Sequence, residues 1–597
     1  MECRKILLIW MMLFAPAVFA GDTPPEWSKG AVWYEIVPER FRNIYTRNDP
    51  VKENVVGEDV DDWQIHPWAS DWYKMQIWEM NRGLTLQELI PQRRYGGDLF
   101  GVSEKLRYLQ DLGVDVICLT PIFEASSILK YDFSTLHHVD NNFGQDRKGD
   151  LEKIVSEKED PANWTLTKAD EAFLDLITRA HDAHMKIVIE VQFNYCGEDF
   201  WAFKDLKEKQ QNSVYKDWFE VFNWDDPATL DTVEFSYQCW QDDKSMPLFK
   251  KSHGMLVEPV KKYILDITKR WMDPNSDGVY TDGIDGWFVS FVNELASDFW
   301  WEWLKYVKSL NPEVITVAES LQEAPHLLGE NKFDVVTNYV LAEVIKTFFI
   351  NSNDEMNLTE FSNALQKLRQ TYPQKINQSL LNLLDSHKTD RLSSVIKNNL
   401  TASNGDLSAN PSRKLDPTKP TEENVRLQKL IALFQMTYVG APMLYYGDET
   451  GMWGTASQDN LKPMLWKEFV YEKESYYAFR PDYAGEVNNV FNQDLYSHYR
   501  LLNKIRHENP ALQTGEYKEY LLDEGKALFA FHRKFDLNEV IVVLNLLPNK
   551  QTLELDVPWK HDTKVKDQLN DLKYKVKNGK LKMGLKKKWG AILVKDK

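Results

Sequence analysis

The sequence predicts an α/β protein built on a (β/α)₈ barrel, with a subdomain inserted after the third strand and an antiparallel β domain at the C-terminus. Eight short apolar runs, rich in β-branched or aromatic residues, alternate with amphipathic stretches such as 103–113 and 166–184. The gap after the third run is too long for one helix, and the pattern changes after about residue 515. Strands that alternate with helices are typical of a parallel sheet, and eight such units close into a barrel.

The eight apolar runs predict the barrel strands in order. A strand buried on both faces of a parallel sheet is apolar throughout rather than at alternate residues. Polar or charged residues follow most of the runs, at the carboxyl ends of the strands, where enzymes with this fold place their sites. The runs are AVWYEIV (31–37), VDVICLTPIF (114–123), KIVIEVQFN (186–194), GWFVSFV (286–292), VITVAES (314–320), FDVVTNY (333–339), SLLNLLDSH (379–387) and APMLYYGDE (441–449).

Two regions fall outside this pattern. Residues 195–255 hold acidic and aromatic residues and few clear helices, so we expect an inserted subdomain there. After residue 514, runs such as ALFAFHRKF (527–535) and EVIVVLNLL (539–547) predict a C-terminal β-sandwich over residues 515–597. The barrel, with its insert, then spans residues 21–514.

Residues 1–20 have the pattern of an export signal. Arg4 and Lys5 precede an apolar run that ends in small residues, and cleavage after Ala20 fits the rule for such signals. The run is shorter than the roughly 20 residues needed to cross a membrane, so we expect no transmembrane segment after cleavage. We therefore expect an exported protein, periplasmic or extracellular, in which Cys196 and Cys239 could form a disulfide.

Charge and composition exclude some partners. The net charge is −18 and no basic block occurs, so nucleic acids and anionic membranes are poor partners. The chain contains 21 Trp, 26 Tyr and 29 Phe. Aromatic rings either pack in a core or offer faces that stack on sugar rings, and composition leaves both interpretations open.

Five motifs occur in one order along the chain. They are WYEIVPERF (33–41), RRYGGDLFGVSEKLRYLQDLGVDVICLTPIF (93–123), KYDFSTLHHVDNNFG (130–144), GIDGW (283–287) and GAPMLYYGDETGMWG (440–454). In this order they resemble the α-amylase superfamily, glycoside hydrolase family 13, and in particular its neopullulanase-like and cyclomaltodextrinase-like members. The resemblance covers roughly residues 28–595, and so many ordered matches argue against chance.

The resemblance implies a retaining glycosidase site, in which one carboxyl group is the nucleophile and another, ~5–5.5 Å away, acts as acid and then base. Glu319 matches the family's general acid. The nucleophile does not match, because Ser290 stands where the family has Asp and Phe288 where it has Arg. A serine hydroxyl is a weak nucleophile unless a base activates it. An arginine left without its carboxylate would be a buried unpaired cation, so we expect the joint replacement to leave a neutral packed site.

The family's third carboxylate is replaced by a cation. In SLLNLLDSHK (379–388) the family pattern would end Ser-His-Asp, and here Lys388 takes the last place. The transition state is oxocarbenium-like. A cation ~5 Å away, at an effective dielectric of ~20, costs roughly 3 kcal/mol, or about two orders of magnitude in rate. We also expect Lys388 to pair with Glu319 and to keep that carboxylate ionised, so that it cannot donate a proton.

Further departures accompany these two. In IEVQFNY (189–195), Glu190 replaces the family's usual Asp and Tyr195 replaces its sugar-contacting His. Leu461 stands where related members often have Arg. Such changes are unexpected in a site that still has to catalyse hydrolysis.

Some sugar-contact positions persist. Tyr131 resembles the tyrosine that stacks on the sugar, and His387 resembles the histidine that contacts its hydroxyls. Trp201, beside Phe200 in the insert, offers a further aromatic face, and core packing is an equal alternative for each aromatic residue. The expected sugar-contact residues are Tyr131, Asn194, His387 and Trp201.

A short loop has the opening spacing of a calcium-binding motif. Asp273, Asn275 and Asp277 match its first ligands, but Ile284 stands where the closing Glu should be. Members of the resembling family often bind calcium, so Ca²⁺ is a possible cofactor. The missing ligand favours a turn-rich loop without metal.

The leading hypothesis is an exported α-amylase-family protein of α-glucan metabolism whose hydrolytic site is dismantled. Such a pseudoenzyme would bind an α-glucan oligosaccharide, similar to maltooligosaccharides, or serve as a partner of another protein. The alternative is an active hydrolase or transglycosidase with Glu319 as general acid and Asp285, Glu294 or Asp385 as the second carboxylate. Strand alternation argues against Asp285 and Glu294, because it aims Ser290 into the barrel mouth instead.

Overall fold

The computed structural model defines the barrel, the insert and the C-terminal domain. It describes residues 24–55, 60–226, 228, 234–350, 355–400, 415–455, 459–476 and 485–596. The expected export signal, residues 1–20, lies outside the described residues. Within them, no helix is both long and apolar enough to span a membrane.

Eight parallel strands form the barrel, as predicted, and each lies inside one of the eight apolar runs. Their order in the sheet is β12-β11-β10-β3-β2-β1-β14-β13. A parallel bridge between Thr337 and Leu381 joins the two edge strands and closes the barrel. The strands are β1 (Trp33–Ile36), β2 (Val116–Leu119), β3 (Lys186–Val191), β10 (Gly286–Val289), β11 (Ile315–Ala318), β12 (Val335–Val336), β13 (Leu381–Leu383) and β14 (Ala441–Tyr445).

The barrel interior is filled with apolar side chains from alternate strand positions. Trp33, Val116, Val188 and Ile315 belong to this inner cluster, and Phe288 packs among them with 3% of its surface exposed. A phenyl ring thus occupies the position where the resembling family has a buried arginine. The interior is a packed core, and open space begins only at the ends of the strands.

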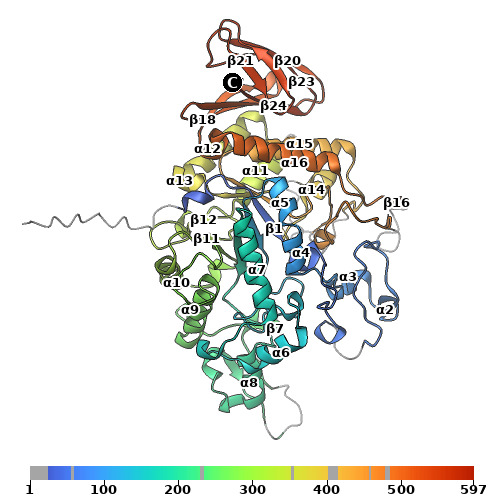
Figure 1. The fold of residues 1–597 in the computed structure, drawn as a ribbon, viewed down its shortest axis with the longest axis vertical. Helices are drawn as coiled ribbons and strands as arrows, with labels where there is room; N and C mark the ends of the chain where they lie inside the picture. Colours follow the sequence, from blue (N-terminus) through green and yellow to red (C-terminus); the bar gives the residue numbers. More distant parts are fainter. Residues whose placement is uncertain are drawn as a thin grey trace, which may run out of the picture.

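Helices cover the outside of the barrel (Figure 1). In α7 (Lys168–Asp182), Thr167 and Asp170 form a capping box, and an apolar stripe that includes Phe173, Leu176 and Ile177 is buried against the sheet. The fifth unit departs from the alternation, because only the 3₁₀ turn η9 (Pro325–Leu327) joins β11 to β12. The other covering helices are α4 (Leu99–Glu104), α5 (Leu106–Leu112), α9 (Glu258–Met272), α10 (Ser297–Leu310), α11 (Tyr339–Ile350), α12 (Leu358–Thr371), α15 (Glu422–Thr437) and α16 (Gln493–Glu508).

The described residues of the insert after β3 form the helix α8 (Trp201–Lys209), the 3₁₀ turns η6 (Gln210–Asn212) and η7 (Lys216–Trp218), and short antiparallel pairs. The pairs are β4 (Val221–Asn223) with β5 (Ser236–Tyr237), β6 (Cys239–Trp240) with β7 (Asp243–Pro247), and β8 (Lys251–Ser252) with β9 (Met255–Leu256). Figure 1 shows α8 and β7 at the end of the molecule opposite the C-terminal domain.

The expected disulfide between Cys196 and Cys239 is wrong, because both thiols are free. Pro247 of β7 lies between them: its carbonyl accepts a bond from Cys196 N, and on its other side it pairs with Cys239. Two neighbouring-strand spacings amount to roughly 9.6 Å, beyond the Cα separation that a disulfide tolerates.

The C-terminal domain consists of two antiparallel layers that sit above α12, α15 and α16 (Figure 1). The larger sheet has the order β17-β18-β19-β24-β21-β22, and β20 pairs with β23. Ile541, Val543, Leu555 and Leu581 belong to the core between the layers. The strands are β17 (Glu516–Asp523), β18 (Leu528–Phe535), β19 (Asn538–Asn545), β20 (Gln551–Asp556), β21 (Lys564–Asp567), β22 (Leu572–Lys575), β23 (Lys580–Leu585) and β24 (Trp589–Lys595).

Candidate active site at the carboxyl ends of the barrel strands

Ser290, Glu319 and Lys388 come together at one end of the barrel. Ser290 and Glu319 directly follow the ends of β10 and β11, and Lys388 lies in the loop after β13. The ammonium Nζ of Lys388 donates to Glu319 Oε2 at 2.5 Å and to Ser290 Oγ at 2.9 Å. The expected ion pair between Lys388 and Glu319 is therefore confirmed.

Glu190 supplies a second carboxylate to the same ammonium. It lies on β3, beside β10 in the sheet, and Lys388 Nζ donates to its Oε1 at 3.1 Å. The same oxygen accepts bonds from Ser290 Oγ and from the Tyr131 hydroxyl, both at 2.5 Å. The longer side chain of Glu190, compared with the family's Asp, thus reaches the place beside residue 290 that the missing nucleophile would occupy.

The expectation of a neutral site is wrong, because the pocket is packed but charged. Burial opposes the ionisation of Glu190, yet the charges of Lys388 and His387 and two hydrogen bonds hold its pKa at about 2. Burial also opposes the charge of Lys388, but the carboxylates of Glu190 and Glu319 raise its pKa above the ordinary value. Lys388 therefore stays an ammonium and cannot serve as a base that activates Ser290.

His387 belongs to the same network and is held by Glu35. Its Nδ1 lies 2.6 Å from Glu35 Oε1 and its Nε2 lies 2.8 Å from the Tyr131 hydroxyl. Burial opposes the imidazolium, but Glu190 and Glu35 outweigh it and raise the pKa of His387. Glu35 was not among the expected site residues. The sequence signal that could have identified it is that Glu35 is the one charged residue in the apolar run 31–37. In the barrel it pairs with Cys118 of β2 and Tyr445 of β14.

Four aromatic side chains form a wall beside Lys388, which we call the aromatic wall: Tyr131, Tyr195, Trp240 and Phe291. Trp240 stacks on Tyr195 with ring centroids 5.3 Å apart, and Phe291 contacts Tyr131, Tyr195 and Trp240. The ammonium of Lys388 lies 5.2 Å from the ring centre of Tyr131 and 5.1 Å from that of Phe291. Trp240 comes from the insert and Phe291 directly follows Ser290, and neither was expected from the sequence.

Phe291 has a backbone conformation that is unusual for its residue type. Its φ is +57°, in the left-handed region that bulky side chains rarely adopt. This turn ends the path of β10 and leads into the 3₁₀ turn η8 (Val292–Glu294). The conformation carries the phenyl ring to the rim of the site, where it contacts the rest of the aromatic wall.

Two of the expected sugar contacts lie apart from this network. Trp201 is packed against Tyr215, Trp218 and Tyr263 with 6% of its surface exposed, which favours the core alternative, and Phe200 is fully buried beside it. Asn194 follows β3 and is 1% exposed.

The side-chain amide of Asn194 has no hydrogen-bond partner among the described residues. Its main-chain atoms are held by Gln192 Oε1 and by Phe249 N. Tyr131 and His387 are therefore the expected contacts that the fold brings to Lys388.

The carboxylates proposed as replacements for the nucleophile are placed elsewhere. Asp285 precedes β10 and pairs with His181 and Lys186 at the opposite end of the strands. Glu294 is exposed in η8. Asp385 accepts a bond from Leu392 N at the start of α14 (Leu392–Asn398).

The loop expected as a calcium candidate is held by its own hydrogen bonds. The Asn275 amide nitrogen donates to Asp277 and Asp282, while its oxygen accepts from Asp277 N. Ile284 at the closing position is 1% exposed and part of the core. Among the described residues, the carboxylates of this loop do not bring three ligand oxygens within 4.8 Å of one another.

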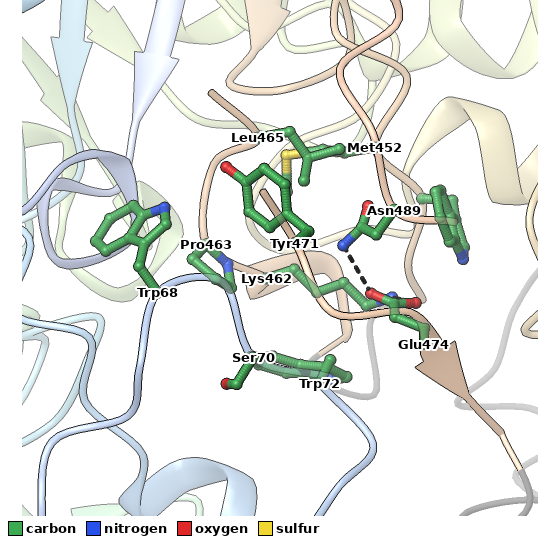
Figure 2. A pocket seen from close by; sticks show the side chains of 11 residues that line it. Trp68, Ser70, Trp72, Met452, Lys462, Pro463, Leu465, Tyr471, Glu474 and Asn489 are labelled. Carbon is green, nitrogen blue, oxygen red and sulfur yellow. Dashed lines mark hydrogen bonds and ion pairs between the residues drawn. The ribbon is translucent and has the colours of Figure 1, made fainter. Parts of the chain in front are cut away.

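A cavity lined by aromatic residues lies between residues 68–72 and the segments 452–453 and 462–474, with Asn489 at its side (Figure 2). Trp68, Trp72 and Tyr471 surround it, and Glu474 binds both Lys462 Nζ, at 2.8 Å, and Asn489 Nδ2, at 3.1 Å. The free space is about 10 Å³, which is about the size of one water molecule. The segments that line this cavity are therefore closely packed, and the cavity has no room for a sugar ring.

Known proteins match this chain in sequence and in fold over most of its length. A family model described as "Alpha amylase, catalytic domain" matches residues 35–160 and 168–515. Neopullulanase 2 of Thermoactinomyces vulgaris is 32% identical over 573 residues, which cover 96% of this chain and 78% of that protein. A cyclomaltodextrinase of Geobacillus thermopakistaniensis (strain MAS1) is 29% identical over 550 residues, covering 92% and 73%. A solved cyclomaltodextrinase structure superposes with a TM-score of 0.70 at 26% identity, covering 96% and 79%.

Proposed function

The chain belongs to the α-amylase family, glycoside hydrolase family 13, and we propose that it is a member that binds α-glucan oligosaccharides without hydrolysing them. The observation that carries the proposal is the position of Lys388. Its ammonium contacts Glu190, Ser290 and Glu319, which surround the place where the family's reaction would occur.

The first step of the family's reaction meets three obstacles in this arrangement. The first step needs a nucleophile and a protonated acid. Ser290 donates a hydrogen bond to Glu190, but a pKa of about 2 makes that carboxylate too weak a base to take the proton of the hydroxyl. The carboxyl group of Glu319 is already bound by the ammonium of Lys388, which lies 2.5 Å from its Oε2. The oxocarbenium-like transition state would also develop its positive charge beside the fixed charge of Lys388.

Binding of a sugar remains compatible with the same arrangement. The side chain of Lys388 is 23% exposed, so the network reaches solvent. Tyr131, Trp240 and Phe291 are each half-buried and offer ring faces at the rim. Aromatic faces stack on the apolar faces of pyranose rings, while the polar groups beneath can bind hydroxyls. The names of the relatives, neopullulanase and cyclomaltodextrinase, support an α-glucan as the ligand class.

A second candidate function is slow hydrolysis with Glu190 as the nucleophile. Lys388 Nζ lies 3.1 Å from Glu190 Oε1 and 2.5 Å from Glu319 Oε2. The two carboxylate oxygens therefore lie no more than about 5.6 Å apart. Retaining glycosidases hold their two carboxyl groups at ~5–5.5 Å. This function would require a bound sugar to displace Lys388 from between the two groups.

The test combines turnover and binding of maltoheptaose. Hydrolysis is measured at high protein concentration for the mature protein, for Glu319→Gln and for Glu190→Gln, all purified identically. Binding is measured by titration calorimetry for the wild type, for Trp240→Ala, and for Trp301→Ala, a control tryptophan that is 45% exposed on α10. Loss of one stacking ring costs roughly 1 kcal/mol, or about a fivefold loss of affinity.

We expect saturable binding that weakens in Trp240→Ala but not in Trp301→Ala, with no turnover above that of Glu319→Gln. Turnover that disappears in both Glu319→Gln and Glu190→Gln would replace the proposal with the second candidate. Absence of any saturable binding would overturn the proposal and leave the protein-partner interpretation.

We also propose that the protein is exported, on the pattern of residues 1–20. N-terminal sequencing of the protein from its native host should begin at Gly21. An intact N-terminus, or a protein retained in the cytoplasm, would refute export.

A further inference from the structure

A second cluster of titratable side chains lies outside the candidate active site, where the segment between β2 and β3 packs on α9. It contains His137, His138, Glu157 and Asp170, each at most 6% exposed. The two histidines lie in the loop after β2, Glu157 ends α6 (Arg147–Ser156), and Asp170 lies in the first turn of α7. His137 and His138 lie in the motif 130–144, but neither the resemblance nor the candidate active site assigned them a role.

His138 is held from both sides by carboxylates. Its Nδ1 lies 2.7 Å from Asp170 Oδ2 and its Nε2 lies 3.1 Å from Glu157 Oε2. Without a metal, an imidazolium that links two carboxylates explains this residue fully. It does not explain its neighbour.

His137 has one ring nitrogen that is left without a partner. Its Nδ1 lies 2.8 Å from Thr135 Oγ1 and 2.9 Å from the Tyr263 hydroxyl, and its ring stacks on Trp164 at 4.5 Å. Its Nε2 is buried and has no hydrogen-bond partner among the described residues. A buried nitrogen without a partner is costly and requires an explanation.

A metal ion would supply the missing partner. One nitrogen of each imidazole and one carboxylate oxygen of Glu157 lie within 4.8 Å of one another. In a tetrahedral zinc site with bonds of about 2.0–2.2 Å, two ligand atoms lie roughly 3.3–3.6 Å apart, so these side chains would draw together when the ion binds. We propose that His137, His138 and Glu157 bind a divalent transition metal ion, with Zn²⁺ as the ion that best suits two imidazoles and one carboxylate.

The surroundings of these three residues match those of known metal ligands. A metal-bound histidine usually donates its other ring N–H to a carboxylate or another acceptor, which fixes the ring. Asp170 is the acceptor for Nδ1 of His138, and the hydroxyls of Thr135 and Tyr263 lie beside Nδ1 of His137. Glu157 is oriented in turn by Thr165, whose N and Oγ1 donate to its carboxylate.

Binding exchanges one proton for the metal. The proton on His138 Nε2 leaves to solvent, and the lone pair that it exposes becomes a ligand, while His137 contributes its free Nε2. Arg270, which contacts Asp170 at 3.1 Å, keeps its ion pair because Asp170 does not bind the metal directly. Three protein ligands leave the fourth position of a tetrahedral ion to water. The ion would join the loop after β2 to the end of α6, a structural role.

The experiment uses the full mature protein after dialysis against a chelator. Zinc binding is measured by titration calorimetry, and thermal stability is measured with and without ZnCl₂. Co²⁺ serves as a spectroscopic substitute, because a four-coordinate site gives strong visible absorption. His137→Phe keeps the stack on Trp164 and removes both nitrogens, and Glu157→Gln keeps an oxygen that can accept from Thr165. His326→Ala, at an exposed histidine, is the control for surface binding.

We expect one saturable site in the wild type and in His326→Ala, a rise in melting temperature with zinc, and Co²⁺ absorption typical of four-coordination. In His137→Phe and Glu157→Gln the affinity should fall by at least about tenfold and the thermal shift should disappear. Circular dichroism establishes that the variants are folded. Absence of a saturable site, or equal affinity in the wild type and both variants, would overturn the proposal.

Discussion

At the residue scale, Lys388 determines the chemistry of the candidate active site. A single lysine in the loop after β13 brings a positive charge to Glu190 and Glu319 and fills the space between them. Glu190 is the necessary counterpart, because its carboxylate keeps the buried ammonium paired. Buried ions are tolerated only when they are paired in this way.

Replacing Lys388 with Met should destabilise the protein by about 3 kcal/mol at neutral pH, because Glu190 and Glu319 would then face each other without a cation. The pKa of Glu190 lies at about 2, below its ordinary value of 4.5. Its stabilising contribution is therefore complete above pH 4.5 and is lost as the pH falls towards 2. The stabilising contribution of Lys388, whose pKa is raised, is complete at any pH below the ordinary lysine pKa of 10.5.

Urea denaturation of wild type and Lys388→Met at about pH 7 and about pH 3.5 measures this effect. The stability gap between the two proteins should shrink at the lower pH, because the carboxylates protonate more readily in the variant. Lys467→Met, at an exposed lysine, should differ from wild type by less than about 0.5 kcal/mol at either pH. A gap that is independent of pH would contradict the ion-pair explanation.

Restoring the family's residues should require four substitutions rather than three. In Phe288→Arg, Ser290→Asp, Lys388→Asp, the new carboxylate at 290 would lie against Glu190, whose Oε1 is 2.5 Å from Ser290 Oγ. Adding Glu190→Asp shortens the side chain at position 190 and moves its carboxylate away from position 290.

We expect the fourfold variant to hydrolyse maltoheptaose at least about tenfold faster than the threefold one, which corresponds to about 1.4 kcal/mol of transition-state stabilisation. The same variant with Glu319→Gln added is the control and should be inactive. If the threefold variant is as active as the fourfold one, Glu190 does not obstruct the site.

At the scale of elements, the junction of β10 and η8 places the aromatic wall. Phe291 holds a left-handed backbone conformation, which costs roughly 1–2 kcal/mol for a residue with a side chain and nothing for glycine. The ring contacts with Tyr131, Tyr195 and Trp240 compensate for that cost. The strained turn is thus the means by which the barrel strand presents a ring to the rim.

The backbone strain at Phe291 and the contacts of its ring can be separated with a pair of variants. Phe291→Ala and Phe291→Gly both lose the ring, but only the alanine keeps the backbone strain. We expect the glycine variant to be more stable than the alanine variant by about 1 kcal/mol in urea denaturation. Both should bind maltoheptaose more weakly than the wild type. An alanine variant as stable as the glycine variant would mean that the turn relaxes without the ring.

At the scale of the whole molecule, the barrel and the C-terminal domain share one hydrophobic core. Phe529 of β18 packs on Phe361 of α12, and Phe531 packs on Phe434 of α15, with ring centroids 5.8 and 6.0 Å apart. The fully buried Arg533 donates to the carbonyls of Thr437 and Gly515 across the same boundary. The larger C-terminal sheet therefore completes the cover of the barrel helices.

We expect the full chain to unfold in a single calorimetric transition, because the two parts cannot lose their shared core separately. A chain that ends at Gly515 would expose Phe361 and Phe434 to water and should be insoluble or lack cooperative unfolding. Differential scanning calorimetry of both proteins measures this. Two well-separated transitions in the full chain, or a soluble shortened chain with native circular dichroism, would contradict it.

The order of strands and helices could be predicted because burial imposes a local pattern on the residues that form them. A central parallel strand is apolar throughout and a covering helix has one apolar stripe, so each run could be located without knowledge of its neighbours. The site was predicted only where a motif assigned a position, as for Glu319, Ser290 and Lys388. Trp201 and Cys239 were misjudged because an aromatic ring or a thiol has the same local signature in a core, at a rim or in a disulfide.

The sequence by itself determined that Ser290, Phe288 and Lys388 stand where the resemblance predicts the nucleophile, the arginine and the third carboxylate, because these are statements about which side chains exist. Only the tertiary structure decided what replaced them. Glu190 reaches Ser290 because β3 and β10 are neighbours in the barrel, and Glu35 reaches His387 across more than 350 residues. Such pairs depend on strand order and side-chain reach in space, and neither leaves a periodic signal along the chain. The charge of the site is therefore a property of the closed barrel.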